Sequence, residues 1–246
     1  MPPDARRTRR PRTKRYEATE NLSTPTIRQE SQARTARVAP SRVSAESWVL
    51  NSRLAFMLLC GVGVATFRLK HDVRLTLIWL VQLGLVLLYA ESGRLKSDYS
   101  LQNLARGAVV GAMVALPFSL FQRDFFYATA ARLYSVGDLQ VLVERAVFLM
   151  PILEGCFFRG MVQREKGLLE GALLFGLMQA VYFISVVNVY PAVIAAVVVG
   201  LTLLGLLYGY LYQRYGLTAS IACHVAVNGV LFVLPVAVDK IHAFLV

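Results

Sequence analysis

A glutamate lies inside a strongly apolar stretch of the chain. Glu154 follows the apolar run 146–153, so its carboxylate cannot easily reach water. An ionisable group at such depth in a membrane costs at least about 2.5 kcal/mol unless it faces a cavity or a partner. Two interpretations stay open: a functional carboxylate, and a structural ion pair or neutral buried acid.

Two further apolar stretches carry imidazole or amide groups. His224 and Asn228 stand four residues apart, hence on one helix face, and Gln179 is the strongly polar residue of its stretch. Taken singly, each is typical of an interhelical hydrogen bond or a satisfied core amide. Around one wet cavity, these groups and Glu154 would satisfy one another. The sequence therefore predicts one shared cavity, which we expect to open toward the cytoplasmic half of the bilayer.

Two neighbours of Glu154 bear on its surroundings. Pro151 lacks an amide proton, which frees the carbonyl of Val147 and predicts a kink or local opening near the acid. Arg159 lies five residues beyond Glu154, about 140° around an α-helix, so the two should not share a face. We expect Arg159 to extend to the cytoplasmic boundary.

The composition predicts a membrane protein. Of 246 residues, 56% are hydrophobic and 17% charged, with a mean hydropathy of +0.53. Since a spanning helix needs roughly 20 apolar residues, the pattern predicts an all-α, polytopic transmembrane bundle of about six to seven helices. The candidate spans are 48–67, 75–90, 104–121, 139–158, 168–187, 192–212 and 217–238. The first two are short or interrupted, and a shallow hairpin is their alternative.

The first part of the chain has a different character. Residues 1–46 are rich in Arg, Thr, Ser and Pro without apolar periodicity, which predicts a disordered basic tail. Before Trp48 there are 11 Lys/Arg against 5 Asp/Glu. The aromatic residues lie in apolar runs and not among the basic ones, so we expect membrane lipid and no nucleic acid as a partner. The expected organisation is this tail, N-terminal transmembrane helices at 47–137, and a four-helix core at 138–246.

Loop charges indicate an orientation. Turns near Arg94, Arg164 and Arg214 are basic and are placed inside with the tail, while the uncharged turn 188–191 suits the outside. The basic turn 68–74 falls outside and conflicts with this scheme. We expect a multi-pass protein of the plasma membrane with a cytoplasmic N-terminus; an organellar membrane stays open, because the tail is rich in Arg, Ser and Thr.

The sequence does not indicate a metal site. Cys60, Cys156 and Cys223 are odd in number, lie in apolar segments and form no CxxC pair. Near the predicted site only His224, Glu154 and two amides are potential ligands, whereas catalytic zinc needs three good ligands plus water. We expect no metal and no cofactor.

The order of these features resembles the CPBP family of intramembrane proteases, which includes the CAAX prenyl endopeptidases and the Abi self-immunity proteins. The first motif of that family is EExxxR, commonly followed by Gly. It is matched here by Glu154, Arg159 and Gly160, while Gly155 replaces the second Glu.

The other two motifs follow in the same order. The second, FxxxH, is matched at Phe175, but Gln179 stands in place of the His. The third, HxxxN, is matched in full by His224 and Asn228. The likeness covers roughly residues 138–238.

The resemblance implies a mechanism for active members. The first-motif Glu and the second-motif His activate a water that attacks a peptide bond, and the third-motif His and Asn stabilise the oxyanion. Gln179 can hold a water but cannot accept a proton, and loss of an acid–base partner typically costs about 10²–10⁴ in rate. The implied catalytic residues are Glu154, Gln179, His224 and Asn228, supported by Arg159, Phe175 and Pro151.

Three functions stay open at this point. The first is a weakened intramembrane endopeptidase, a hydrolase acting on a protein or peptide substrate. The second is an inactive pseudoprotease, a membrane scaffold that uses the cavity to bind a partner protein or lipid-modified peptide. The third is a small transporter, which inverted repeats with broken helices would indicate, and the sequence has none.

Overall fold

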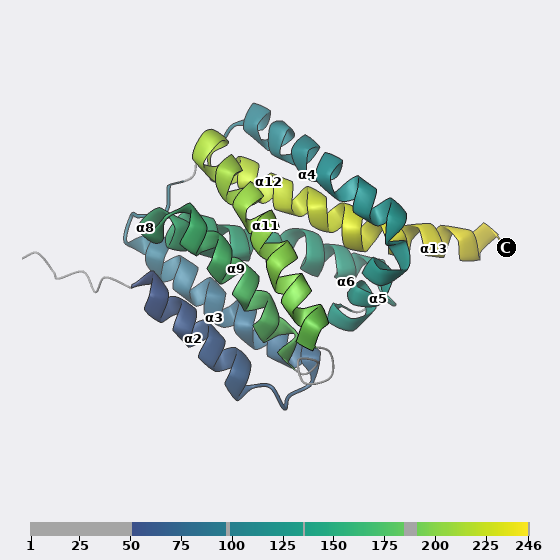
Figure 1. Cartoon of the computed structure of the whole chain (residues 1–246), viewed down its shortest axis with the longest axis horizontal. Coiled ribbons are helices and arrows are strands. Elements are labelled where there is room, and N and C mark those ends of the chain that lie inside the picture. The colour runs from purple at the N-terminus through teal and green to yellow at the C-terminus, as the bar shows by residue number, and fades with distance from the viewer. Residues whose placement is uncertain (1–50, 97–98, 135, 185–190, 246) are drawn as a thin grey trace, which may run out of the picture. The chain divides into compact units, whose positions relative to one another are not determined.

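The computed structural model describes residues 51–96, 99–134, 136–184 and 191–245. Within these ranges the regular secondary structure is helical throughout (Figure 1). The predicted all-α bundle is therefore confirmed. The tail predicted at 1–46 lies outside the described residues.

The helices follow the predicted apolar spans, and each span corresponds to one helix or to several that run on without a break. The short helix α5 is an addition that was not predicted. The helices, with π-helical segments labelled η, are α2 (Ser52–Ala65), α3 (His71–Glu91), α4 (Leu101–Phe121), α5 (Arg123–Leu133), α6 (Leu139–Val143), η1 (Glu144–Leu149), α7 (Met150–Glu154), η2 (Gly155–Gln163), α8 (Arg164–Lys166), α9 (Leu168–Tyr182), α11 (Pro191–Tyr215), α12 (Leu217–Asn228), η3 (Gly229–Val233) and α13 (Leu234–Leu245).

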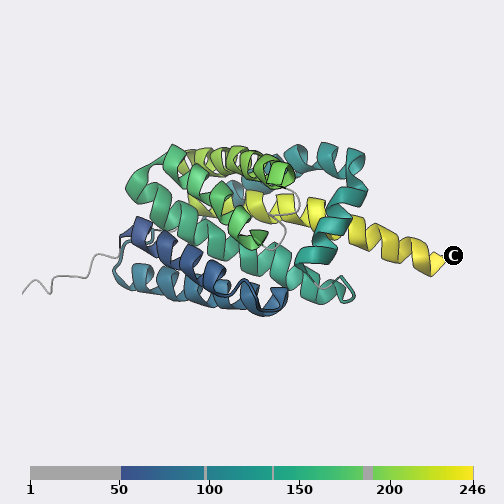
Figure 2. The same cartoon turned by 60° about the horizontal axis from the view of Figure 1, so that its bottom comes forward.

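Four helical stretches of the described chain are long and apolar enough to cross a membrane. They are His71–Glu91, Leu101–Phe121, Pro191–Tyr215 and Leu217–His242. The last of them runs through α12, η3 and α13, and α13 carries the C-terminus away from the other helices (Figures 1 and 2). Helices α2 and α9 are apolar but shorter, with 14 and 15 residues.

Helix α4 packs along α12 through a row of small residues. The buried residues of α4 are Gly107, Gly111, Ala115 and Ser119, spaced four apart on one face. A Cβ atom at Gly107 or Gly111 would collide with the backbone of α12. Small residues at this spacing let helix backbones approach closely in a membrane, where apolar burial does not drive association.

Helices α2 and α3 form a hairpin that packs against α7, η2 and α9 (Figure 1). At one end of the bundle, Arg53 of α2 makes a two-armed ion pair with Glu170 of α9, at 2.7 and 2.8 Å. The amide of Ser52 also donates to Glu165 Oε2 at 3.2 Å. These contacts hold the start of α2 against the junction of α8 and α9.

At the opposite end, one basic residue of the conflicting turn 68–74 has an internal role. Arg74 is 1% exposed, and its guanidinium donates to the carbonyl oxygen of Tyr182, at the last turn of α9. That turn has carbonyls without helical partners, so a buried cation there is stabilised. Arg74 is thus a buried bond between α3 and α9 and carries no information about membrane orientation.

Candidate active site

The glutamate predicted as the central residue lies where two helix types meet. Glu154 ends α7, and the π-helix η2 begins at Gly155; a second π-helix, η1, ends just before Met150. In a π-helix each amide bonds the carbonyl five residues back, and such segments occur frequently at functional sites. The predicted local opening near Pro151 takes the form of these two π-helical segments.

The π register changes which carbonyl Pro151 leaves free. The amide of Met150 bonds the carbonyl of Arg145, five residues back. By the same register the amide of residue 151 would bond Ala146, but proline has no amide proton. Instead, Asn228 Nδ2 donates to the Ala146 oxygen at 2.8 Å. The freed carbonyl was expected at Val147, and the shift by one residue follows from the π register.

The π register also overturns the expectation for Arg159. An i→i+5 helix turns Arg159 toward the same side as Glu154, and the two side chains interact electrostatically. Arg159 does not extend to the boundary: it is 2% exposed. Its guanidinium lies over the rings of Phe175, at 5.0 Å, and Tyr208, at 5.9 Å. Its two terminal nitrogens have no hydrogen-bond partner among the described residues.

Glu154 lies between the amide and the imidazole that were predicted to join it. Gln179 Nε2 is 3.5 Å from Glu154 Oε1, a long hydrogen bond, and His224 Nε2 is 3.8 Å from Glu154 Oε2. All three side chains are buried, with Glu154 only 1% exposed. The structure therefore brings together three polar groups from α7, α9 and α12. Apo sites often hold such groups slightly apart, and the contacts tighten when a substrate binds.

Aromatic rings fix the imidazole. His224 stacks on Tyr208 with centroids 4.7 Å apart and meets the ring of Phe175 edge-on at 5.6 Å. Phe175 in turn packs edge-on against Phe158, at 5.5 Å. The second-motif Phe175 therefore contacts both Arg159 and His224.

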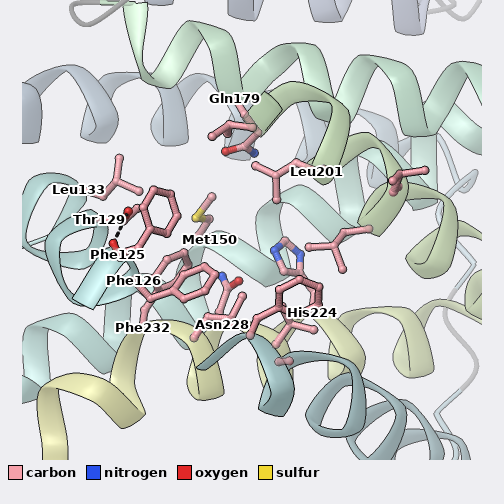
Figure 3. A pocket seen from close by; sticks show the side chains of 18 of the residues that line it. Phe125, Phe126, Thr129, Leu133, Met150, Gln179, Leu201, His224, Asn228 and Phe232 are labelled. Atoms are coloured by element: carbon pink, nitrogen blue, oxygen red, sulfur yellow. Dashed lines mark hydrogen bonds between the residues drawn. The ribbon is translucent and has the colours of Figure 1, made fainter. Parts of the chain in front are cut away.

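A cavity of about 820 Å³ adjoins these residues. Gln179, His224 and Asn228 line it, and Figure 3 shows Gln179 facing the other two across the cavity. The remaining wall is mostly apolar, with Thr129 and Arg132 of α5 as further polar members. Such a space, apolar with a few polar groups, is typical of a site for a small or chain-like ligand.

One expectation about this cavity needs correction. Glu154 is not among the lining residues, so its carboxylate lies behind Gln179 and His224 and not on the open wall. In addition, the lining reaches Thr129 and Val193, at the end of the bundle where α5 lies and α11 begins. Nothing in the structure shows which side of the membrane this end faces, so the cytoplasmic opening stays a prediction.

Gly155, which stands in place of the second Glu of the first motif, is tightly packed against α12. A Cβ atom at Gly155 would lie 2.5 Å from Cγ1 of Ile221 on α12. A larger residue at 155 therefore requires Ile221 to move. The substitution of Gly for Glu thus goes together with a close approach of η2 and α12.

The described residues contain no cluster of three or more His, Cys, Asp or Glu side chains that could hold a metal ion. The potential metal ligands within 4 Å of the Glu154 carboxylate include an amide and a single imidazole. We assign no metal ligand among them.

The sequence reasoning missed three aromatic residues around the site. Tyr208 supports His224 and Arg159, Tyr182 approaches Glu154, and Trp79 approaches Tyr182. One signal for Tyr182 was available, since it lies three residues after Gln179 and hence on the same face of α9. Trp79 lies on α3, far from the motifs, and no sequence signal connects it to them.

A buried carboxylate, amide and imidazole within an apolar helical bundle define a membrane protein with an internal polar site. The family model described as type II CAAX prenyl endopeptidase Rce1-like matches residues 138–230, a range that contains all four predicted site residues. No curated protein and no solved structure matches the chain. Residues 138–230 therefore match an Rce1-like domain, which supports the resemblance to the CPBP/CAAX proteases, and this match together with the four long apolar helices fits an integral membrane protein.

Proposed function

We propose that this protein is a CAAX-type intramembrane endopeptidase of reduced activity. The observation that carries the proposal is the position of Glu154. Gln179 and His224, which line a large cavity, lie 3.5 and 3.8 Å from its two carboxylate oxygens. A carboxylate held in low dielectric is a good general base once it is ionised.

The proposed reaction uses one water. Glu154 takes a proton from a water held by Gln179, and the resulting hydroxide attacks the carbonyl carbon of the scissile peptide bond. The oxyanion that forms accepts hydrogen bonds from the ring N–H of His224 and the second amide proton of Asn228, whose first proton bonds Ala146. Collapse of the intermediate breaks the C–N bond, and the proton held by Glu154 passes to the leaving amine.

The cavity suggests the substrate class. Its mostly apolar wall and its volume of about 820 Å³ suit a peptide that carries a long apolar group. The family name refers to prenylated peptides, and we propose these as the first substrates to test. We further propose a plasma-membrane location with the N-terminus in the cytoplasm, and membrane lipid as the surrounding partner.

One observation favours a second candidate, a pseudoprotease that binds such a peptide without cleaving it. Gln179 cannot act as an acid or base, and the Glu154 carboxylate does not line the cavity. In this case the cavity would serve to bind a membrane partner protein or a lipid-modified peptide.

A cleavage assay in proteoliposomes tests the proposal. A quenched fluorescent peptide with a prenylated cysteine near its C-terminus should be cleaved by the wild type and not by Glu154→Ala. Glu170→Ala is the matched control, because Glu170 is an acid on α9 that pairs with Arg53 at the end of the bundle. Photo-crosslinking of the same peptide without any cleavage would instead support the pseudoprotease.

A further inference from the structure

Besides the two terminal nitrogens of Arg159, three buried polar atoms near the site have no hydrogen-bond partner among the described residues. They are one carboxylate oxygen of Glu154, Oε2, the hydroxyl of Tyr182 and the indole nitrogen of Trp79. These side chains are 1%, 2% and 5% exposed. Buried polar groups are nearly always paired, so three orphans in one region call for an explanation.

The three groups are neighbours from three helices. The Tyr182 hydroxyl lies within interaction range of the Glu154 carboxylate on one side and of the Trp79 indole on the other. Helix α3, which carries Trp79, packs directly against α7, which ends at Glu154. None of these contacts has ordinary hydrogen-bond geometry. A small side-chain rotation or a single bridging water would connect the three groups by hydrogen bonds.

Donor and acceptor chemistry allows only one direction for such a chain. An indole N–H only donates, an ionised carboxylate only accepts, and a phenol hydroxyl does both. The indole of Trp79 must therefore donate to the Tyr182 oxygen, and the Tyr182 hydroxyl must donate to Glu154.

A second contact fixes the same tyrosine. Arg74, one and a half turns before Trp79 on α3, donates from its buried guanidinium to the carbonyl oxygen of Tyr182. Helix α3 thus holds Tyr182 at its backbone and meets it at its side chain. This helix lies outside the range 138–230 that the family match covers.

We propose that α3 completes the site from outside the Rce1-like domain, through a hydrogen-bond relay in which Trp79 donates to Tyr182 and Tyr182 donates to Glu154. Tyr182 is then a positioning residue: it holds one carboxylate oxygen while Gln179 holds the other, which turns the carboxylate toward the cavity wall. Its role in catalysis rests on the proposed function, whereas the relay itself is a property of the folded chain.

A double-mutant cycle tests the relay without reference to activity. Tyr182→Phe and Trp79→Phe each remove one polar group and retain a ring, and their effects on the thermal midpoint in nanodiscs are compared with that of the double variant. Residues of one hydrogen-bond relay should show coupled effects on stability. The thermal midpoint of the double variant should therefore lie close to that of Tyr182→Phe alone. Tyr89→Phe is the matched control, because Tyr89 is a second buried tyrosine, on α3, near Glu165 and not near Glu154. It should combine additively with Trp79→Phe.

Fluorescence and kinetics provide two further readouts. The chain has two tryptophans, so Trp48→Phe leaves Trp79 as the sole emitter, and Tyr182→Phe should shift its emission to the blue as the indole loses its acceptor. If the wild type cleaves peptide, Tyr182→Phe should lower kcat about tenfold with little change in KM, the rate equivalent of one hydrogen bond to a charged group.

The outcomes separate the two proposals. Additive stability effects together with an unchanged Trp79 emission would overturn the relay, whether or not the wild type is active. Coupled effects in a wild type that cleaves nothing would support the relay and contradict the proposed protease function.

Discussion

Asn228 donates from Nδ2 to the carbonyl oxygen of Ala146, 2.8 Å away and 82 residues earlier in the chain. The acceptor is free because Pro151 offers no amide proton in the π register of η1. Asn228 of the third motif is thus held by a carbonyl of η1 that lacks a helical donor. This bond connects the third motif to the helical stretch that carries Glu154 of the first motif.

Asn228→Ala should leave the buried Ala146 carbonyl unpaired and lower the free energy of unfolding by about 1–3 kcal/mol. Thermal unfolding in nanodiscs measures this. Asn103→Ala is the control, since Asn103 also donates to a backbone carbonyl, that of Tyr215, at 3.0 Å. It should lower stability comparably and leave cleavage unchanged. Equal loss of cleavage in both variants would contradict a special role for Asn228.

Gly155→Glu, which restores the family's second carboxylate, should destabilise the protein because its Cβ meets Ile221. Overpacking of this kind costs about 1–3 kcal/mol. Adding Ile221→Ala should recover much of the loss by opening the space. If Gly155→Glu alone folds with wild-type stability, the packing account of this position is wrong.

Arg159→Lys should be more harmful than Arg159→Met. The guanidinium is held flat over Phe175 and Tyr208, a contact that contributes about 2 kcal/mol when desolvated. A lysine would bury a compact, strongly hydrated ammonium, whereas methionine fills the space without a charge. The thermal midpoints of the two variants decide this, and a lysine variant as stable as the wild type would refute it.

Gly111→Leu should disrupt the packing of α4 on α12, because a Cβ atom there meets the α12 backbone and lies 3.0 Å from the Ala226 Cβ. The control is Gly61→Leu on α2, where no atom lies within 4 Å. We expect the yield of monodisperse protein in detergent to fall strongly for the first variant and little for the second. A similar yield for both would mean that close approach of α4 is not required.

Much of the fold was predictable because apolar length decides where helices form in a membrane protein. The gathering of Glu154, Gln179 and His224 was predictable too, since isolated polar groups are expensive at that depth. The environment of Arg159 was not, because the prediction assumed 100° per residue and the chain is π-helical there.

The contribution of α3 to the site could not be predicted from the sequence either. Trp79 and Arg74 approach the site through tertiary packing, and their spacing shows no motif. The sequence placed Arg74 among loop charges, while the structure buries it against the end of α9. Charge counts near helix ends assume exposed side chains, and that assumption fails for a buried guanidinium.

The most direct test of the central claim is the cleavage rate of Gln179→His in proteoliposomes. If Glu154 is a general base that lacks the second-motif His, an imidazole at position 179 should raise the cleavage rate by about tenfold or more. Adding Glu154→Ala to Gln179→His should then abolish cleavage. An unchanged rate in Gln179→His, or a gain that survives removal of the Glu154 carboxylate, would contradict the proposed site.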